Sequence, residues 1–97
     1  MSVLAVEISG IDNPTNFILF GICSEWKWKK VLEEAGKALE WKNPKEAARL
    51  FRATGAEVKE ASLSLVEKND RLVVTRGEEF KGQGNLHIAL FATPSIA

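Results

Sequence analysis

The sequence is poor in the residues that form disulfides and metal centres. Among its 97 residues are one cysteine, Cys23, and one histidine, His87. A single cysteine cannot form a disulfide within the chain, and a single histidine without neighbouring cysteines lacks the ligand spacing of a zinc site. We therefore expect no metal, no cofactor, no catalytic group and no enzyme activity, and a structural or surface role for His87.

Charge of one sign and long apolar runs are also missing. Thirteen basic residues balance thirteen acidic ones, so the formal net charge is zero. A protein dedicated to nucleic acid usually carries a basic excess, which argues against nucleic acid as the main partner. The longest apolar run, residues 17–23, is far shorter than the roughly 20 residues that cross a bilayer. With no signal-peptide pattern at the N-terminus, these absences predict a cytoplasmic protein with no membrane partner.

The composition that remains is that of a folded domain. Hydrophobic residues make up 45% of the chain and charged residues 27%, an ordinary balance for a globular protein. The length suits one domain and leaves no room for two. We expect a single domain over 1–97, with a core at about 3–82 and an extra strand or a tail at 83–97.

Two strands are predicted at the N-terminal end. Residues 3–9 alternate, with Leu4, Val6 and Ile8 on one face and polar residues on the other, which is the pattern of a half-buried strand. Turn-forming residues follow at 10–14, and the apolar run at 17–23 predicts a second strand. Neighbouring strands joined by a short turn predict an antiparallel hairpin.

The period then changes to that of a helix. Trp28, Leu32, Ala35 and Leu39 recur at helical spacing, which predicts a helix over 25–40 with one apolar stripe. Ser24 is placed to cap its N-terminus. Gly36 lowers helix stability by up to about 1 kcal/mol relative to Ala, so its presence indicates close approach of a neighbouring segment.

Shorter elements are expected beyond the helix. Asn43 as a cap, Pro44 at the first helical position and Glu46 as the partner of a capping box predict one helical turn. A helix continuing over 44–53 is the alternative to a strand at 48–52. The remaining expectations are an edge strand at 57–59, a connector with a short apolar segment at 62–66, a strand at 71–76 and a last strand at 86–92.

The order of these elements predicts an α+β protein with a β-grasp (ubiquitin-like) fold. A helix with one apolar stripe and a sheet with one apolar face bury each other. We expect a mixed sheet of four to five strands packed on one main helix. The strand at 71–76 would lie beside the first strand in the middle of the sheet.

More narrowly, the stretch from Trp28 to Lys81 resembles doublecortin domains. The helix containing Val31-Leu32-Glu33-Glu34-Ala35, the hairpin Ala48-Arg49-Leu50-Phe51 with Gly55-Ala56-Glu57-Val58, and the strand Leu72-Val73-Val74-Thr75 before Glu79-Phe80-Lys81 carry the resemblance. It covers a little over half of the chain. It implies a ubiquitin-like fold and binding to microtubules through basic surface.

One group of basic residues begins at the predicted helix and continues beyond it. An exposed Trp beside cations is typical of a binding hot spot. The alternatives are a solubilising face for the cations and a Trp that packs over the start of the helix. The candidate partner-binding residues are Trp26, Lys27, Lys29, Lys30, Lys42, Lys45, Arg49 and Arg52.

These observations favour a non-catalytic protein-interaction domain associated with the cytoskeleton. Its partner would be tubulin or a cytoskeletal scaffold. The alternative is a generic ubiquitin-like interaction module of a larger scaffold protein, with no role at microtubules. Self-association through an edge strand, or through the apolar run at 86–91, is a further expectation, because an unpaired edge can accept another strand.

Overall fold

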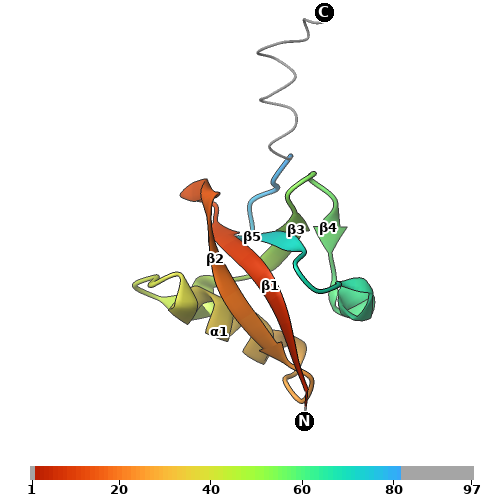
Figure 1. Cartoon of the computed structure of the whole chain (residues 1–97). Coiled ribbons are helices and arrows are strands. Elements are labelled where there is room, and N and C mark those ends of the chain that lie inside the picture. The colour runs from red at the N-terminus through yellow and green to blue at the C-terminus, as the bar shows by residue number, and fades with distance from the viewer. Residues whose placement is uncertain (1, 82–97) are drawn as a thin grey trace, which may run out of the picture.

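The computed structural model describes residues 2–81 of the chain, and it is α+β. The last predicted strand, at 86–92, the tail at 83–97 and His87 lie outside the described residues. The elements follow one another as a hairpin, a helix, a second hairpin and a last strand (Figure 1). They are β1 (Val3–Gly10), β2 (Asn13–Cys23), α1 (Trp28–Ala38), the 3-10 helix η1 (Pro44–Glu46), β3 (Arg49–Arg52), β4 (Glu57–Val58), the 3-10 helix η2 (Glu60–Leu65) and β5 (Arg71–Thr75).

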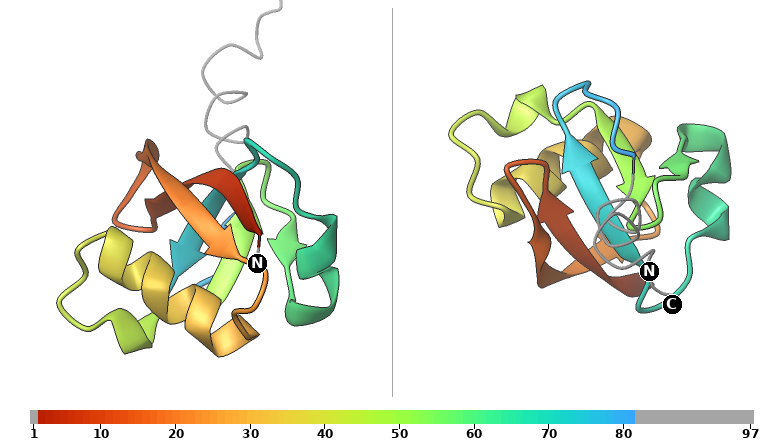
Figure 2. Two further views of the ribbon diagram at one scale, coloured as in Figure 1. Left: turned by 60° about the horizontal axis from the view of Figure 1, so that its bottom comes forward. Right: turned by 90° about the horizontal axis from the view of Figure 1, so that it is seen from above.

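The strands form one five-stranded mixed sheet in the order β2-β1-β5-β3-β4. β1 and β2 are antiparallel, which confirms the predicted hairpin. β5 lies in the middle, parallel to β1 and antiparallel to β3, which confirms its predicted place beside the first strand. β2 and β4 form the two opposite edges of the sheet (Figure 2).

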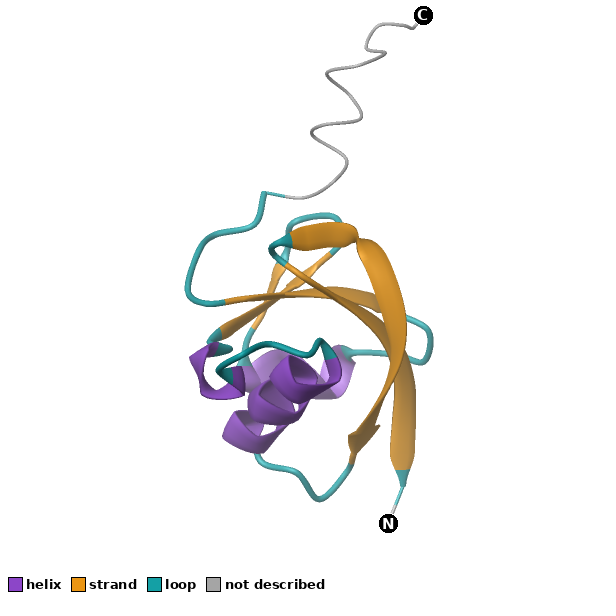
Figure 3. Ribbon diagram, turned by 90° about the vertical axis from the view of Figure 1, so that its left-hand side faces the viewer, coloured by secondary structure: helices purple, strands orange, loops and turns teal. Residues whose placement is uncertain are grey.

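The main core lies between the sheet and α1. Figure 3 shows the helices on one side of the strongly twisted sheet. Val6, Ile8, Leu72 and Val74 point from the central strands to this side and are 0 to 1% exposed. They meet the predicted stripe of α1, whose buried members are Val31, Leu32 and Ala35, together with Gly36.

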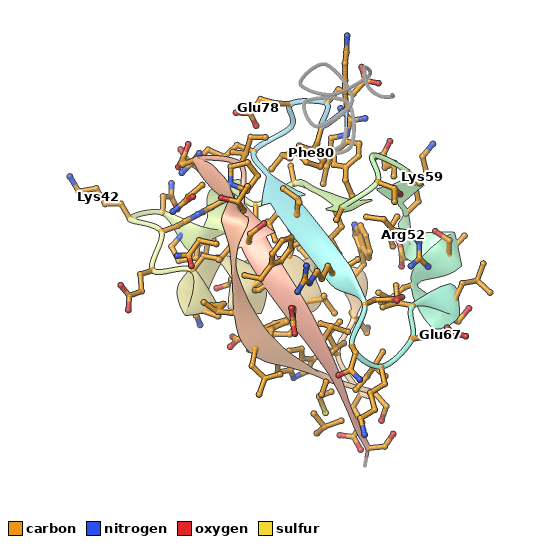
Figure 4. All side chains as sticks on the ribbon, turned by 45° about the horizontal axis from the view of Figure 1, so that its top comes forward. Lys42, Arg52, Lys59, Glu67, Glu78 and Phe80 are labelled. Atoms are coloured by element: carbon orange, nitrogen blue, oxygen red, sulfur yellow. The ribbon has the colours of Figure 1, made fainter. Side chains whose placement is uncertain are left out.

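The opposite face of the sheet is also covered at one end. After β5 the chain folds back and places Phe80, labelled in Figure 4, over Phe51 and Val73. The rings of Phe51 and Phe80 meet edge to face, with centroids 6.3 Å apart. Ser9, predicted on this face, is fully buried, and its hydroxyl donates a hydrogen bond to the carbonyl oxygen of Pro14.

The predicted start of the helix is wrong by about one turn. Ser24 does not cap it; the backbone N–H of Ser2 donates to the Ser24 hydroxyl instead. A tight turn follows β2, closed by a bond from the Trp26 N–H to the Cys23 carbonyl. Trp26 then packs against the ring of Phe20. Because this contact keeps the chain extended through Lys27, α1 begins only at Trp28 and ends at Ala38.

The segment after α1 is corrected in its details. A single turn forms at Pro44, as predicted, but no side chain caps it, because the Glu46 carboxylate points to Arg76, 3.4 Å away. The chain then enters the strand β3, so a helix over 44–53 is wrong. The apolar stretch in the predicted connector forms the 3-10 helix η2.

Gly36 brings η1 against α1, as its place in the helix predicted. A Cβ atom at Gly36 would lie 2.8 Å from the carbonyl oxygen of Pro44 and 2.9 Å from its Cα. Both are backbone atoms, which cannot move aside as the end of a flexible side chain can.

Gly36→Ala is therefore expected to destabilise the protein, although Ala is the better helix former. Overpacking typically costs about 1–3 kcal/mol, which outweighs the roughly 1 kcal/mol gained in helix propensity. Urea unfolding of the variant and wild type measures the difference. Lys29→Ala, an exposed position on the same helix, should change the free energy of unfolding by less than about 0.5 kcal/mol. A more stable Gly36→Ala variant would contradict the close contact.

Phe80→Ala should lower the free energy of unfolding by about 3 kcal/mol, because it removes a buried aromatic ring. Phe80 is 8% exposed and covers Phe51 and Val73. The matched control is Leu65→Ala, at a side chain that is 68% exposed. Equal effects of the two substitutions in thermal or urea unfolding would show that Phe80 does not cover the outer face.

Candidate functional site

The structure brings three of the predicted cations to the rim of one hollow. This hollow, of about 790 Å³, lies between the first turns of α1, the turn η1 and the start of η2. Lys27 reaches it from the position just before α1, Lys29 from the first turn of α1, and Lys45 from η1. Lys45, 16 residues after Lys29 in the sequence, thus lines the same hollow because η1 folds back against α1.

These three lysines are the unpaired cations of the site. All three are exposed, and none has a carboxylate partner among residues 2–81. Two acidic residues, Glu33 and Glu60, also line the hollow. Glu33 lies 3.8 Å from Lys37, so part of its charge is already offset.

The floor of the hollow is apolar. Leu32 and Ala47 are buried at its base, and the half-buried Trp28 forms one wall. Binding sites combine an apolar surface, which supplies affinity, with a few placed polar groups, which orient the ligand. An apolar side chain flanked by acidic groups is the ligand that matches this floor and rim.

Two other predicted lysines lie elsewhere. Lys30 forms an ion pair with Glu34, 3.0 Å away, on the exposed face of α1; with Lys37 it lowers the pKa of Glu34. Lys42 projects from the loop between α1 and η1 (Figure 4) and lines a separate hollow near the β1–β2 turn. Neither side chain reaches the rim formed by Lys27, Lys29 and Lys45.

Arg49 is occupied by contacts within the domain. Its guanidinium donates to both carboxylate oxygens of Glu57, at 2.9 and 3.1 Å, and to the carbonyl oxygen of Gly77. It also lies over the ring of Phe51. The pair lowers the pKa of Glu57, first through the hydrogen bond. Arg49 therefore ties β3 to β4.

Arg52 is occupied in the same way. Its guanidinium donates to Asp70 at 2.8 Å and to the carbonyl oxygen of Leu65 at 3.3 Å, beside η2 (Figure 4). Asp70 also accepts a bond from the Glu67 backbone N–H. That bond is the main reason that the pKa of Asp70 is lowered, and Arg52 is the second.

Trp26 packs within the domain. It is half-buried, its ring centroid lies 6.1 Å from that of Phe20, and it lines a third hollow with Leu4 and Cys23. Of the two interpretations left open by the sequence, packing at the start of the helix describes its contacts.

The sequence did not point to several residues of the hollow. Trp28 and Leu32 were predicted as core stripe, and they also form its wall and floor. Ala47, Ala48 and Glu60 join them only because η1 and η2 close around α1. The one sequence signal for this arrangement was Gly36, because a glycine within the helix indicated that another segment packs closely against it.

A separate cluster of contacts, centred on Arg76, lies near the β1–β2 turn. Arg76 lies over the ring of Trp41, 4.1 Å from its centroid, and both its terminal nitrogens donate to Asp12. This pairing lowers the pKa of Asp12. Because the guanidinium is held by the domain itself, the cluster has a structural role.

The chain matches no protein-family model, no curated protein and no solved structure in the comparisons made with each. Within residues 2–81, no group of three or more His, Cys, Asp or Glu side chains could hold a metal ion. In this same part of the chain, no helix has the length and apolar character needed to cross a membrane.

Asp70→Asn should lower the free energy of unfolding at neutral pH, because it weakens the charge-assisted bonds that the carboxylate accepts. The loss should be only about 1 kcal/mol, because solvent partly screens these bonds. A carboxylate whose pKa is lowered by folding stabilises the native state above its ordinary pKa of 3.8. That contribution disappears as the pH falls through the native pKa. The difference between the variant and wild type should therefore shrink below about pH 4.

Urea unfolding of both proteins between neutral pH and about pH 3 measures this difference. Glu67→Gln, in the same turn, is the control, because that side chain has no ion pair within residues 2–81. A difference between Asp70→Asn and wild type that stays constant with pH would contradict the role given to the carboxylate.

Proposed function

We propose that this chain is a β-grasp (ubiquitin-like) domain with a non-catalytic, protein-binding role. The sheet order β2-β1-β5-β3-β4, the parallel central pair and the helix after the first hairpin support the fold assignment. A fold alone does not identify a function. The role therefore rests on the surface that the elements build.

The observation that carries the proposal is the lysine-rimmed hollow over an apolar floor. Lys27, Lys29 and Lys45 have no ion-pair partner within residues 2–81, whereas Arg49 and Arg52 are held by carboxylates. Unpaired cations around an apolar floor favour an acidic protein segment with an apolar anchor. Such rim charges chiefly raise the association rate and make binding depend on salt.

Tubulin is the partner that we propose first. The resemblance to doublecortin domains implies microtubule binding through basic surface, and the acidic surface of tubulin suits a lysine rim. The hollow supplies a local basic surface on a chain whose formal net charge is zero.

A second candidate is a generic interaction module with a different acidic partner. It is favoured by the engagement of Arg49 and Arg52 in structural contacts. With these two cations occupied, the basic surface is smaller than the sequence indicated. The two candidates share one binding site and differ in the partner.

Co-sedimentation with polymerised tubulin, at low and at physiological salt, tests the proposal. We expect pelleting at low salt that weakens as salt screens the exposed charges. Lys29→Glu combined with Lys45→Glu reverses the rim from both sides of the hollow and should weaken binding at least about tenfold, or about 1.4 kcal/mol.

The control is Lys42→Glu combined with Lys68→Glu, which changes the net charge equally at exposed positions outside the hollow. It should weaken binding by less than about threefold. Equal losses in both variants would assign the effect to overall charge. No pelleting of wild type at low salt would contradict tubulin as the partner and leave the second candidate.

A further inference from the structure

β2 is a long edge strand with an open side. It runs over 11 residues and has β1 as its only neighbour in the sheet formed by residues 2–81. From Phe17 to Cys23 its outward face is apolar; Phe17 is half-buried beneath Arg71, and Leu19 is 74% exposed. Val3 of β1, 65% exposed, continues this surface.

The backbone of β2 offers hydrogen bonds toward this open side. The Ser24 N–H donates to Ser2, and bonded pairs alternate along an antiparallel ladder. The register then makes Leu4–Ile22 and Val6–Phe20 the bonded pairs. The intervening residues of β2 are Leu19, Gly21 and Cys23, and their N–H and C=O groups point away from β1.

The strand next to β2 behaves as this alternation requires. Glu7 and Ala5, which lie opposite Leu19 and Gly21, turn their backbone groups to the other side. There the Glu7 N–H donates to the Asp70 carbonyl, and the Ala5 carbonyl accepts from the Asn69 N–H, at 2.9 and 2.8 Å.

The two edges of the sheet are protected differently. β4 has only two residues, one of them the charged Glu57, which is held by Arg49. β2 has no charged residue anywhere between Asn13 and Cys23. Natural edge strands avoid pairing by being short, charged or bulged, and from Phe17 to Cys23 the β2 edge has none of these features.

We propose that β2 pairs with β2 of a second copy of this chain, forming an antiparallel two-fold dimer with a continuous sheet. This proposal does not depend on the acidic partner. Because the strand is uncharged, pairing with itself brings no like charges together. If the two-fold axis passes through a residue of β2, each odd-numbered residue lies opposite an odd-numbered residue of the second copy. The odd-numbered residues Leu19, Gly21 and Cys23 carry the outward-pointing N–H and C=O groups, so these groups can bond across the interface.

Side-chain sizes favour an axis at Phe20. Leu19 then lies opposite Gly21 of the second copy, and Phe17 lies opposite Cys23 of the second copy, so each large side chain faces a small one. The Val3 side chain lies over Gly21, where a Cβ atom would come within 2.7 Å of it. Leu19 of the second copy would therefore pack against Val3.

Sedimentation velocity of the full chain under reducing conditions, from about 1 to about 500 μM, tests the proposal. One strand pair is small beside the roughly 1,600 Å² of a standard interface, so we expect reversible dimers with a Kd on the order of 10 μM. Leu19→Lys places a charge on the edge and should weaken dimerisation at least about tenfold. A wild-type chain that stays monomeric over this range would overturn the proposal.

Leu65→Lys is the matched control, since Leu65 is 68% exposed, close to the 74% of Leu19, but lies in η2, away from β2. It should leave the dimer intact, and equal losses in both variants would indicate unspecific apolar association and overturn the proposal. Amide exchange at Leu19 and Gly21 separates the occupants. Protection that rises with concentration supports a second copy; protection independent of concentration would overturn it in favour of a segment of the same chain.

Discussion

The parallel pairing of β1 with β5 is the contact on which the rest of the structure depends. Parallel strands cannot be joined by a tight turn, so this pair closes a long connection that contains β2, α1, β3, β4 and both 3-10 helices. It places Val6 and Ile8 beside Leu72 and Val74 under α1. Because Val73 points to the covered opposite face, β5 is buried on both sides. That is why its sequence is a continuous apolar run instead of an alternating one.

The sequence predicted those elements whose signals are local and periodic. Alternation defined β1, the helical stripe defined α1, and the apolar run defined β5. Errors arose where a distant contact outweighed a local preference. Ser24 has the chemistry of a cap, but Trp26 packs on Phe20 and delays the helix. The short apolar segment expected at 62–66 as part of a connector lies mostly in η2, where Ser62 exchanges two hydrogen bonds with the backbone of Lys59, the residue before that helix.

The candidate site was harder to predict, because charge pairing depends on contacts across the fold. Arg49 bonds to Glu57 across the β3–β4 hairpin. Arg52 of β3 bonds to Asp70, which lies 18 residues later in the sequence. These pairs remove two cations from the predicted basic group. Of the candidate lysines that remain unpaired, Lys27, Lys29 and Lys45 converge because η1 packs on α1 at Gly36, whereas Lys42 lies at a separate hollow. Composition reports how many charges a chain carries, whereas the fold decides which of them face a partner.

The two proposed surfaces lie on different elements, and this separation has a consequence for binding. No residue of β2 lines the lysine-rimmed hollow, so a dimer through β2 would leave both hollows accessible. Three exposed lysines on a chain whose formal net charge is zero would give weak binding that salt reduces further. A dimer that engages two sites on a repetitive acidic surface converts the second contact into an intramolecular one, which can strengthen overall binding by roughly 10²-fold or more. Pairing of an uncharged edge would in that way compensate for the small number of free cations.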